Sequence, residues 1–108
     1  MEYAAIIKGQ RDFFNANVTK DLHFRAEQLR KLKSLLQANE KRLFEAIYAD
    51  FRKGEFETYA TELGILYGDI GVALKKMRRW SRQKRVLTNL PNMPARSFIV
   101  PEPYGVCL

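Results

Sequence analysis

The sequence predicts a mainly α-helical chain of three to four amphipathic helices that continues into a short β-hairpin. Apolar residues recur at helical spacing through residues 1–83, and the residues that follow are rich in proline, β-branched and aromatic types. The chain has 108 residues, of which 46% are hydrophobic and 29% charged, a composition typical of globular proteins. We therefore expect one soluble domain or part of one.

The first predicted helix covers about residues 3–16. Its apolar side chains recur at helical spacing and leave the charged ones facing water: Tyr3, Ile6, Ile7, Phe13 and Phe14 against Lys8, Arg11 and Asp12. A polar break with Asn15, Asn17 and Thr19 follows. Asp21 is the predicted N-cap of the next helix, because its carboxylate can accept hydrogen bonds from the unpaired N–H groups of a first turn.

The second predicted stretch keeps its apolar residues on one helical face at 100° per residue. That stripe consists of Leu22, Ala26, Leu29, Leu32, Leu36, Leu43 and Ile47. Asn39 is a point at which the stretch can divide into two helices without interrupting the stripe. Residues 50–55 are predicted to end it, with Gly54 as the left-handed residue of the turn.

The third predicted helix has the clearest apolar face, made of Leu63, Leu66, Tyr67, Ile70, Leu74 and Met77. Three glycines, Gly64, Gly68 and Gly71, interrupt it, and each lowers helix propensity by up to ~1 kcal/mol relative to alanine. We interpret them as positions of close packing against another element. They do not form a phosphate-binding turn, because they lie inside a helix and not between a strand and a helix.

Prolines after the third helix predict a change from helix to extended chain. Pro91 and Pro94 exclude a helix interior, so residues 84–96 are predicted to be an extended, basic and proline-containing connector. Two strand-like runs, residues 97–100 and 104–108, are predicted to pair across Pro101-Glu102-Pro103. The resulting division is a helical part over residues 1–83, the connector over 84–96, and a truncated β-hairpin that starts over 97–108.

The net charge of +7 comes from one segment. Residues 1–74 carry eleven basic and eleven acidic residues, whereas residues 75–108 carry eight basic residues and only Glu102 as an acid. The basic run over residues 75–85 resembles an ordinary solvated helix end, where cations are favoured by the helix dipole. The alternative is a basic module that binds nucleic acid or an anionic membrane; its binding should weaken steeply with salt.

No catalytic, cofactor-binding or metal-ligating residue is predicted. His23 lies beside the apolar stripe and is expected to be a partly exposed surface residue, and Cys107 on an apolar strand is expected to be a small buried hydrophobic residue. One histidine and one cysteine cannot make a tetrahedral zinc site. The lack of a signal peptide, of a membrane-spanning stretch and of a second cysteine predicts a cytoplasmic location.

The chain resembles the N-terminal segment of an aldehyde dehydrogenase, most closely the class-three and fatty-aldehyde branch. The residues that carry the resemblance follow in the family's order: Phe24-Arg25 with Leu29 and Leu32, Asp50-Phe51-Arg52-Lys53, Thr61-Glu62, Trp80, Lys84-Arg85-Val86, Pro91-Asn92-Met93-Pro94-Ala95 and Pro101-Glu102-Pro103-Tyr104-Gly105-Val106. The last of these is the most specific. Together they cover nearly the whole chain.

The resemblance implies an α/β fold and an enzyme that oxidises aldehydes to carboxylates with NAD or NADP, through a cysteine thiohemiacetal. It places the Trp-Asn motif, the glycine turn, the general base and the nucleophile beyond Leu108, so this chain is expected to be inert alone. Cys107 matches an apolar strand position and not the nucleophile. In the family the first helices pack on the cofactor-binding domain, and the hairpin belongs to a region that helps to join the two subunits of a homodimer. We therefore expect the remainder of that fold as the partner, with no nucleic acid and no membrane.

Overall fold

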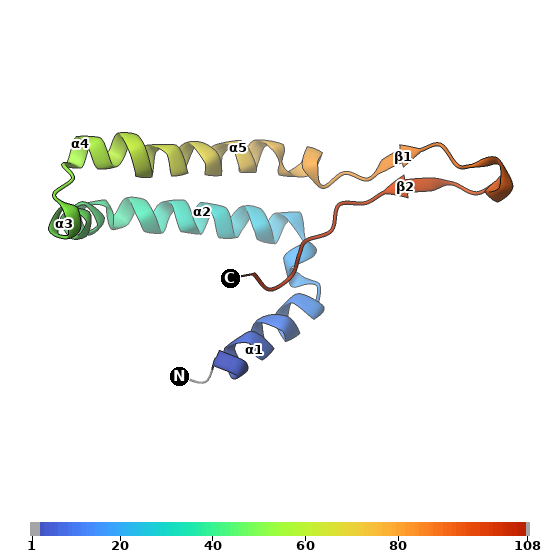
Figure 1. Cartoon of the computed structure of the whole chain (residues 1–108), viewed down its shortest axis with the longest axis horizontal. Helices are drawn as coiled ribbons and strands as arrows, with labels where there is room; N and C mark the ends of the chain where they lie inside the picture. Colours follow the sequence, from blue (N-terminus) through green and yellow to red (C-terminus); the bar gives the residue numbers. More distant parts are fainter. Residues whose placement is uncertain (1–2, 108) are drawn as a thin grey trace. The chain divides into compact units, whose positions relative to one another are not determined.

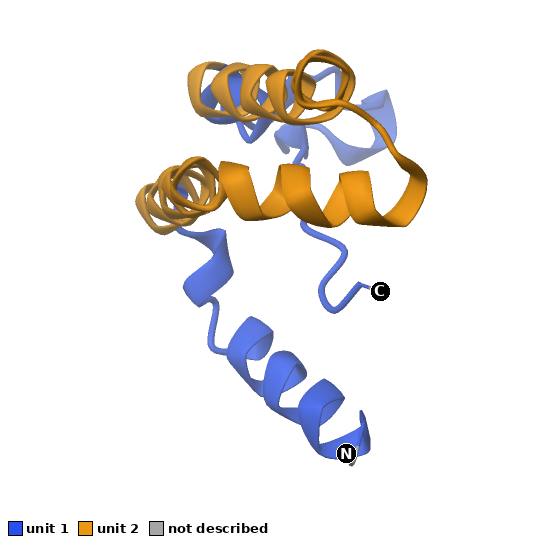
Figure 2. Ribbon diagram, turned by 90° about the vertical axis from the view of Figure 1, so that its left-hand side faces the viewer, with its two compact units in different colours: residues 1–22, 76–108 blue, residues 23–75 orange. Residues whose placement is uncertain are grey.

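The computed structural model describes residues 3–107 (Figure 1). Its helices are α1 (Tyr3–Asn15), α2 (Leu22–Ala38), α3 (Glu40–Phe51), α4 (Glu55–Thr58) and α5 (Gly64–Trp80), and its strands are β1 (Lys84–Val86) and β2 (Ser97–Ile99). The chain divides into two compact units: residues 1–22 with 76–108, and residues 23–75 (Figure 2). The predicted class, helices followed by a short antiparallel hairpin, is confirmed.

The break after the first helix lies where the polar residues predict it. α1 ends at Asn15, Asn17 adopts a left-handed backbone with φ 62°, and a 3₁₀ turn covers Val18–Lys20. Asp21 then has φ −67° and ψ 124°, the extended backbone of an N-cap residue, directly before α2. The predicted helix start is therefore confirmed.

Asn39 divides the second stretch into α2 and α3, as the sequence predicts. Its side-chain Nδ2 donates to the carbonyl of Leu35 at 2.8 Å, and its own carbonyl accepts the first bond of α3 from the Leu43 N–H at 3.0 Å. Asn39 thus forms hydrogen bonds with both helices. Within residues 23–75, α2 and α5 run side by side in opposite directions, and α3 runs across them (Figures 1 and 2).

The prediction that Gly54 is the left-handed residue of the next turn is wrong. That residue is Arg52, with φ 61°, whose N–H bonds the Tyr48 carbonyl at 2.9 Å and closes α3. The Arg52 guanidinium lies 5.4 Å from the centre of the Tyr48 ring, a favourable cation–π distance. Because the chain has already turned at Arg52, Gly54 is extended, with φ −69° and ψ 161°, and serves as the N-cap of α4.

The third helix is continuous but contains a π-helical turn at Tyr59–Leu63, between α4 and α5. A side chain at Gly64 would come within 2.9 Å of the Tyr59 carbonyl, so this position requires glycine. A methyl group placed on Gly68 or Gly71 would meet no neighbour within 4 Å. Among the described glycines of this helix, close packing is therefore found only at Gly64. The neighbour there is the π-turn of the same helix and not another element.

The β-hairpin forms between segments other than those predicted. β1, inside the expected connector, pairs antiparallel with β2, with Lys84 opposite Ile99 and Val86 opposite Ser97. Pro91 and Pro94 lie in the hairpin loop, and the Thr88 and Ser97 hydroxyls meet at 2.9 Å at its base. Pro101 and Pro103 lack the N–H groups that a ladder needs, and Gly105 has φ 98°, so residues 104–107 form no strand. Leu108 lies outside the described residues, and the domain division at residues 83 and 96 stays a prediction.

The core of the described residues is small. Leu63 and Ile70, from the predicted face of the third helix, are 6% and 3% exposed, whereas Leu66 is 38% exposed. Thr58 is completely buried, and its Oγ1 has no hydrogen-bond partner in the described part of the chain. A buried hydroxyl without a partner is destabilising because it has lost its bonds to water.

We expect Thr58→Val to raise the free energy of unfolding by about 1 kcal/mol, because valine has the same shape and removes the unpaired hydroxyl. Urea unfolding of the chain, followed by far-ultraviolet circular dichroism, measures the change. Thr61→Val is the matched control, since Thr61 is exposed and its Oγ1 donates to the Glu57 carbonyl at 2.8 Å. Equal effects of the two substitutions would contradict the assignment.

Candidate functional site

His23 and Cys107, the two residues with reactive side chains that the sequence singles out, are both exposed. His23 is on the surface, with its Nδ1 3.9 Å from Glu27 Oε1. Cys107 is exposed rather than buried as expected, with its Sγ 3.6 Å from the Gly105 carbonyl. No group of three or more His, Cys, Asp or Glu side chains that could hold a metal ion is found among residues 3–107.

The basic run does not form one continuous helical face. α5 ends at Trp80, and Arg82 follows in the turn, where its N–H makes a long 3.4 Å bond to the Arg79 carbonyl. Arg78 and Arg79 thus lie in the last turn of α5, next to the negative end of the helix dipole. Arg85 is already in β1. This placement fits the interpretation of the run as a solvated helix end.

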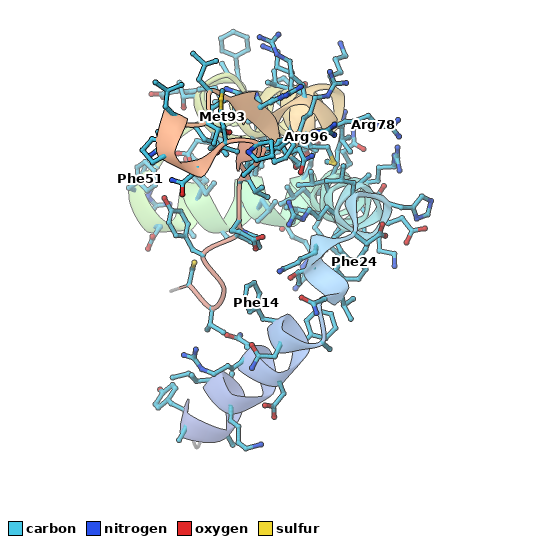
Figure 3. All side chains as sticks on the ribbon, turned by 90° about the vertical axis from the view of Figure 1, so that its right-hand side faces the viewer. Phe14, Phe24, Phe51, Arg78, Met93 and Arg96 are labelled. Carbon is cyan, nitrogen blue, oxygen red and sulfur yellow. The ribbon has the colours of Figure 1, made fainter. Side chains whose placement is uncertain are left out.

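The motif Glu-Pro-Tyr-Gly packs against the N-terminal residues of its own unit. Glu102 Oε2 lies 3.1 Å from Lys20 Nζ, and a methyl group placed on Gly105 would contact the Phe14 ring at 3.5 Å. Figure 3 shows the Phe14 ring on the side of α1 that faces this segment. The positive φ of Gly105 requires glycine at the turn. The motif therefore connects the segment after the hairpin to α1.

Two other motifs of the resemblance meet in the second unit. Lys53, the last residue of Asp-Phe-Arg-Lys, has a side chain that is 13% exposed, and its Nζ lies 2.7 Å from Oε1 of Glu62, the second residue of Thr-Glu. The Lys53 Nζ also lies 5.8 Å from the centre of the Phe51 ring. These contacts hold the turn between α3 and α4 in place, so the motifs have a structural role in this chain.

Sequence reasoning missed the hydrogen bond that joins α3 to α5. The Tyr67 hydroxyl donates to Glu40 Oε1 at 2.7 Å, and the bond is partly buried. Lys33 Nζ of α2 lies 6.0 Å from the centre of the Tyr67 ring, and the Tyr59 ring meets the Tyr67 ring edge-on at 6.3 Å. The sequence identified Tyr67 as a residue of a buried face, but Glu40 is distant in sequence and nothing in the spacing links the two.

Burial raises the pKa of Tyr67 from 10.0 to about 12, with further contributions from the hydrogen bond and the charge of Glu40 and from Tyr59. The neutral phenol is the form that donates to Glu40, so the contact exists in the protonated state. Because the folded-state pKa lies above the unfolded one, the stability contributed by Tyr67 is complete below about pH 10 and is lost as the pH rises through about 12.

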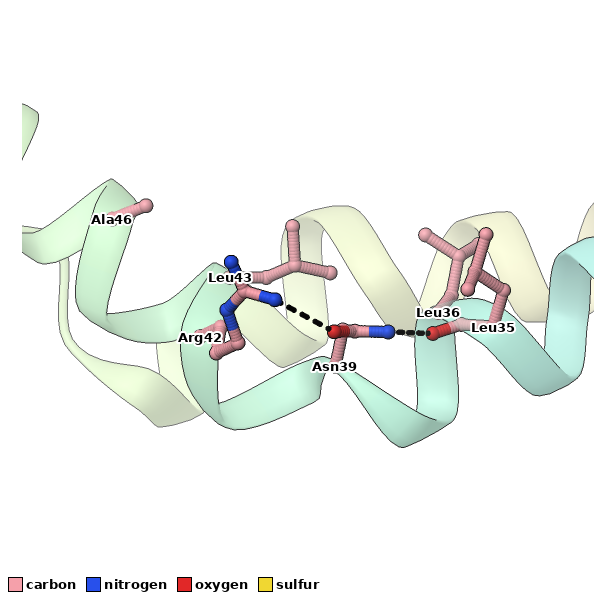
Figure 4. Close-up of a pocket in the computed structure, with 6 residues that line it drawn as sticks. All are labelled: Leu35, Leu36, Asn39, Arg42, Leu43 and Ala46. Atoms are coloured by element: carbon pink, nitrogen blue, oxygen red, sulfur yellow. Dashed lines mark hydrogen bonds between the residues drawn. The ribbon is translucent and has the colours of Figure 1, made fainter.

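An apolar groove lies along the junction of α2 and α3 (Figure 4). It encloses about 430 Å³ and is lined by Leu35, Leu36, Asn39, Arg42, Leu43 and Ala46. Arg42 is the one charged residue of this lining. The sequence placed Leu36 and Leu43 on the apolar stripe, but the groove itself depends on the break at Asn39. The described residues that line the groove therefore make packing contacts and do not form a reactive site.

We expect Tyr67→Phe to lower the free energy of unfolding by about 1 kcal/mol at neutral pH, because it removes the Glu40 hydrogen bond and keeps the ring. Tyr48→Phe is the control, since Tyr48 is 51% exposed. Unfolding of both variants is measured between neutral pH and pH 12. Stability of the parent should fall toward the Tyr67→Phe value over the upper part of this range; parallel curves would contradict the role of Tyr67.

Known proteins that resemble the chain are aldehyde dehydrogenases. The chain is 44% identical over 96 residues to 4,4'-diaponeurosporen-aldehyde dehydrogenase of Staphylococcus aureus, covering 89% of this chain and 21% of that protein. It is 37% identical over 98 residues to human aldehyde dehydrogenase family 3 member B1, covering 91% and 21%. No protein-family model matches.

A solved structure supports the same relationship. The chain superimposes on AldH of Staphylococcus aureus in its substrate-bound state with a TM-score of 0.82 and 42% identity, over 88% of this chain and 21% of that one. The chain thus spans about a fifth of the length of the curated relatives it matches. In sequence and in structure it corresponds to an N-terminal segment of the class-three-like aldehyde dehydrogenases.

Proposed function

We propose that this chain is the N-terminal segment of an NAD(P)-dependent aldehyde dehydrogenase, and that its role is structural. Its partner is the remainder of that fold, which supplies the cysteine nucleophile, the general base and the cofactor site. The observation that carries the proposal is the structural match: 88% of the chain superimposes on 21% of a dehydrogenase at 42% identity. By itself the chain is catalytically inert.

The distribution of apolar surface supports this role. In the described part of the chain, two large hydrophobic residues are buried, and many others are largely exposed: Leu35 at 61%, Phe51 at 59%, Phe56 at 88%, Ile65 at 56%, Leu87 at 96% and Leu90 at 83%. Contiguous exposed apolar surface in a soluble protein marks an interaction site. Covering these side chains with the remainder of the fold accounts for the apolar surface that the described residues leave exposed.

The proposal includes NAD or NADP as the cofactor and a homodimer, which the family resemblance implies. It also includes a cytoplasmic location, which rests on the sequence pattern and the single cysteine. None of the described helices is long and apolar enough to span a membrane. The comparisons do not support the alternative of a nucleic-acid-binding module, and in the structure the basic run ends a helix as ordinary solvated residues do.

A chimera tests the proposal. The segment of the Staphylococcus aureus dehydrogenase that matches this chain is replaced by the chain itself, and reduction of NAD and NADP is measured with the aldehyde in that enzyme's name. We expect the chimera to fold and oxidise the aldehyde, because the segment supplies packing and the remainder supplies the chemistry. The isolated chain should give no turnover. Turnover by the isolated chain, or a chimera that does not fold, would refute the proposal.

Cys107→Ser in the same chimera tests the role of the one cysteine of the chain. We expect the oxidation rate and its pH profile to stay unchanged, because Cys107 is exposed and its thiol lies 3.6 Å from the Gly105 carbonyl oxygen, which is not a base. A loss of activity at unchanged thermal stability would show that Cys107 takes part in the reaction.

A further inference from the structure

We draw no further inference here: the strongest candidate, the surface of the β1–β2 hairpin on which Leu87, Leu90 and Met93 are exposed, carries nothing, because no described residue shows what covers it and its burial by the remainder of the fold or by a second subunit restates the partners of the proposed function.

Discussion

The hydrogen bond between Tyr67 and Glu40 determines how the helices of the second unit are arranged. It joins the first turn of α3 to the first turn of α5 at 2.7 Å, and Lys33 of α2 lies over the same ring at 6.0 Å. Three helices therefore converge on one phenol. Because the bond is directional and partly buried, it specifies which faces of the helices meet, whereas apolar contacts alone tolerate sliding.

The π-turn at Tyr59–Leu63 belongs to the same arrangement. A π-turn adds a residue to a helix and changes which side chains lie on its inner face beyond that point. Here Tyr59 begins the turn and meets Tyr67 edge-on, and Gly64 leaves room for the Tyr59 carbonyl. Leu63 and Ile70, the two buried apolar residues described, follow the start of this turn. The inner face of α5 thus depends on an irregularity in the helix that precedes it.

The motifs that connect the chain to the aldehyde dehydrogenases are mostly devices for turns and contacts. Lys53 and Glu62 secure the turn between α3 and α4, while Glu102 and Gly105 connect the end of the chain to Lys20 and Phe14. These residues stabilise the fold whether or not they contact a substrate. In this segment, similarity of sequence therefore reports a shared scaffold, and the structural match to a dehydrogenase agrees with it.

The sequence by itself determined the helices, because their signals are local. Apolar residues at helical spacing, the polar break before Asp21 and the side chain of Asn39 placed α1, α2 and α3 correctly. The expectation that the chain carries no catalytic set also comes from the sequence, since it concerns residue types and needs no geometry. The resemblance identified the family for a similar reason, because its motifs are contiguous in the chain.

Only the tertiary structure decided the contacts between distant residues. The strand partner of residues 97–99 is β1 and not the segment after Pro103, because pairing depends on N–H groups available across space. The left-handed residue is Arg52 and not Gly54, because the hydrogen bond to Tyr48 closes the helix first. The Tyr67–Glu40 bond and the α2–α3 groove arise when helices come together in space, and periodicity along one helix carries no information about its neighbour.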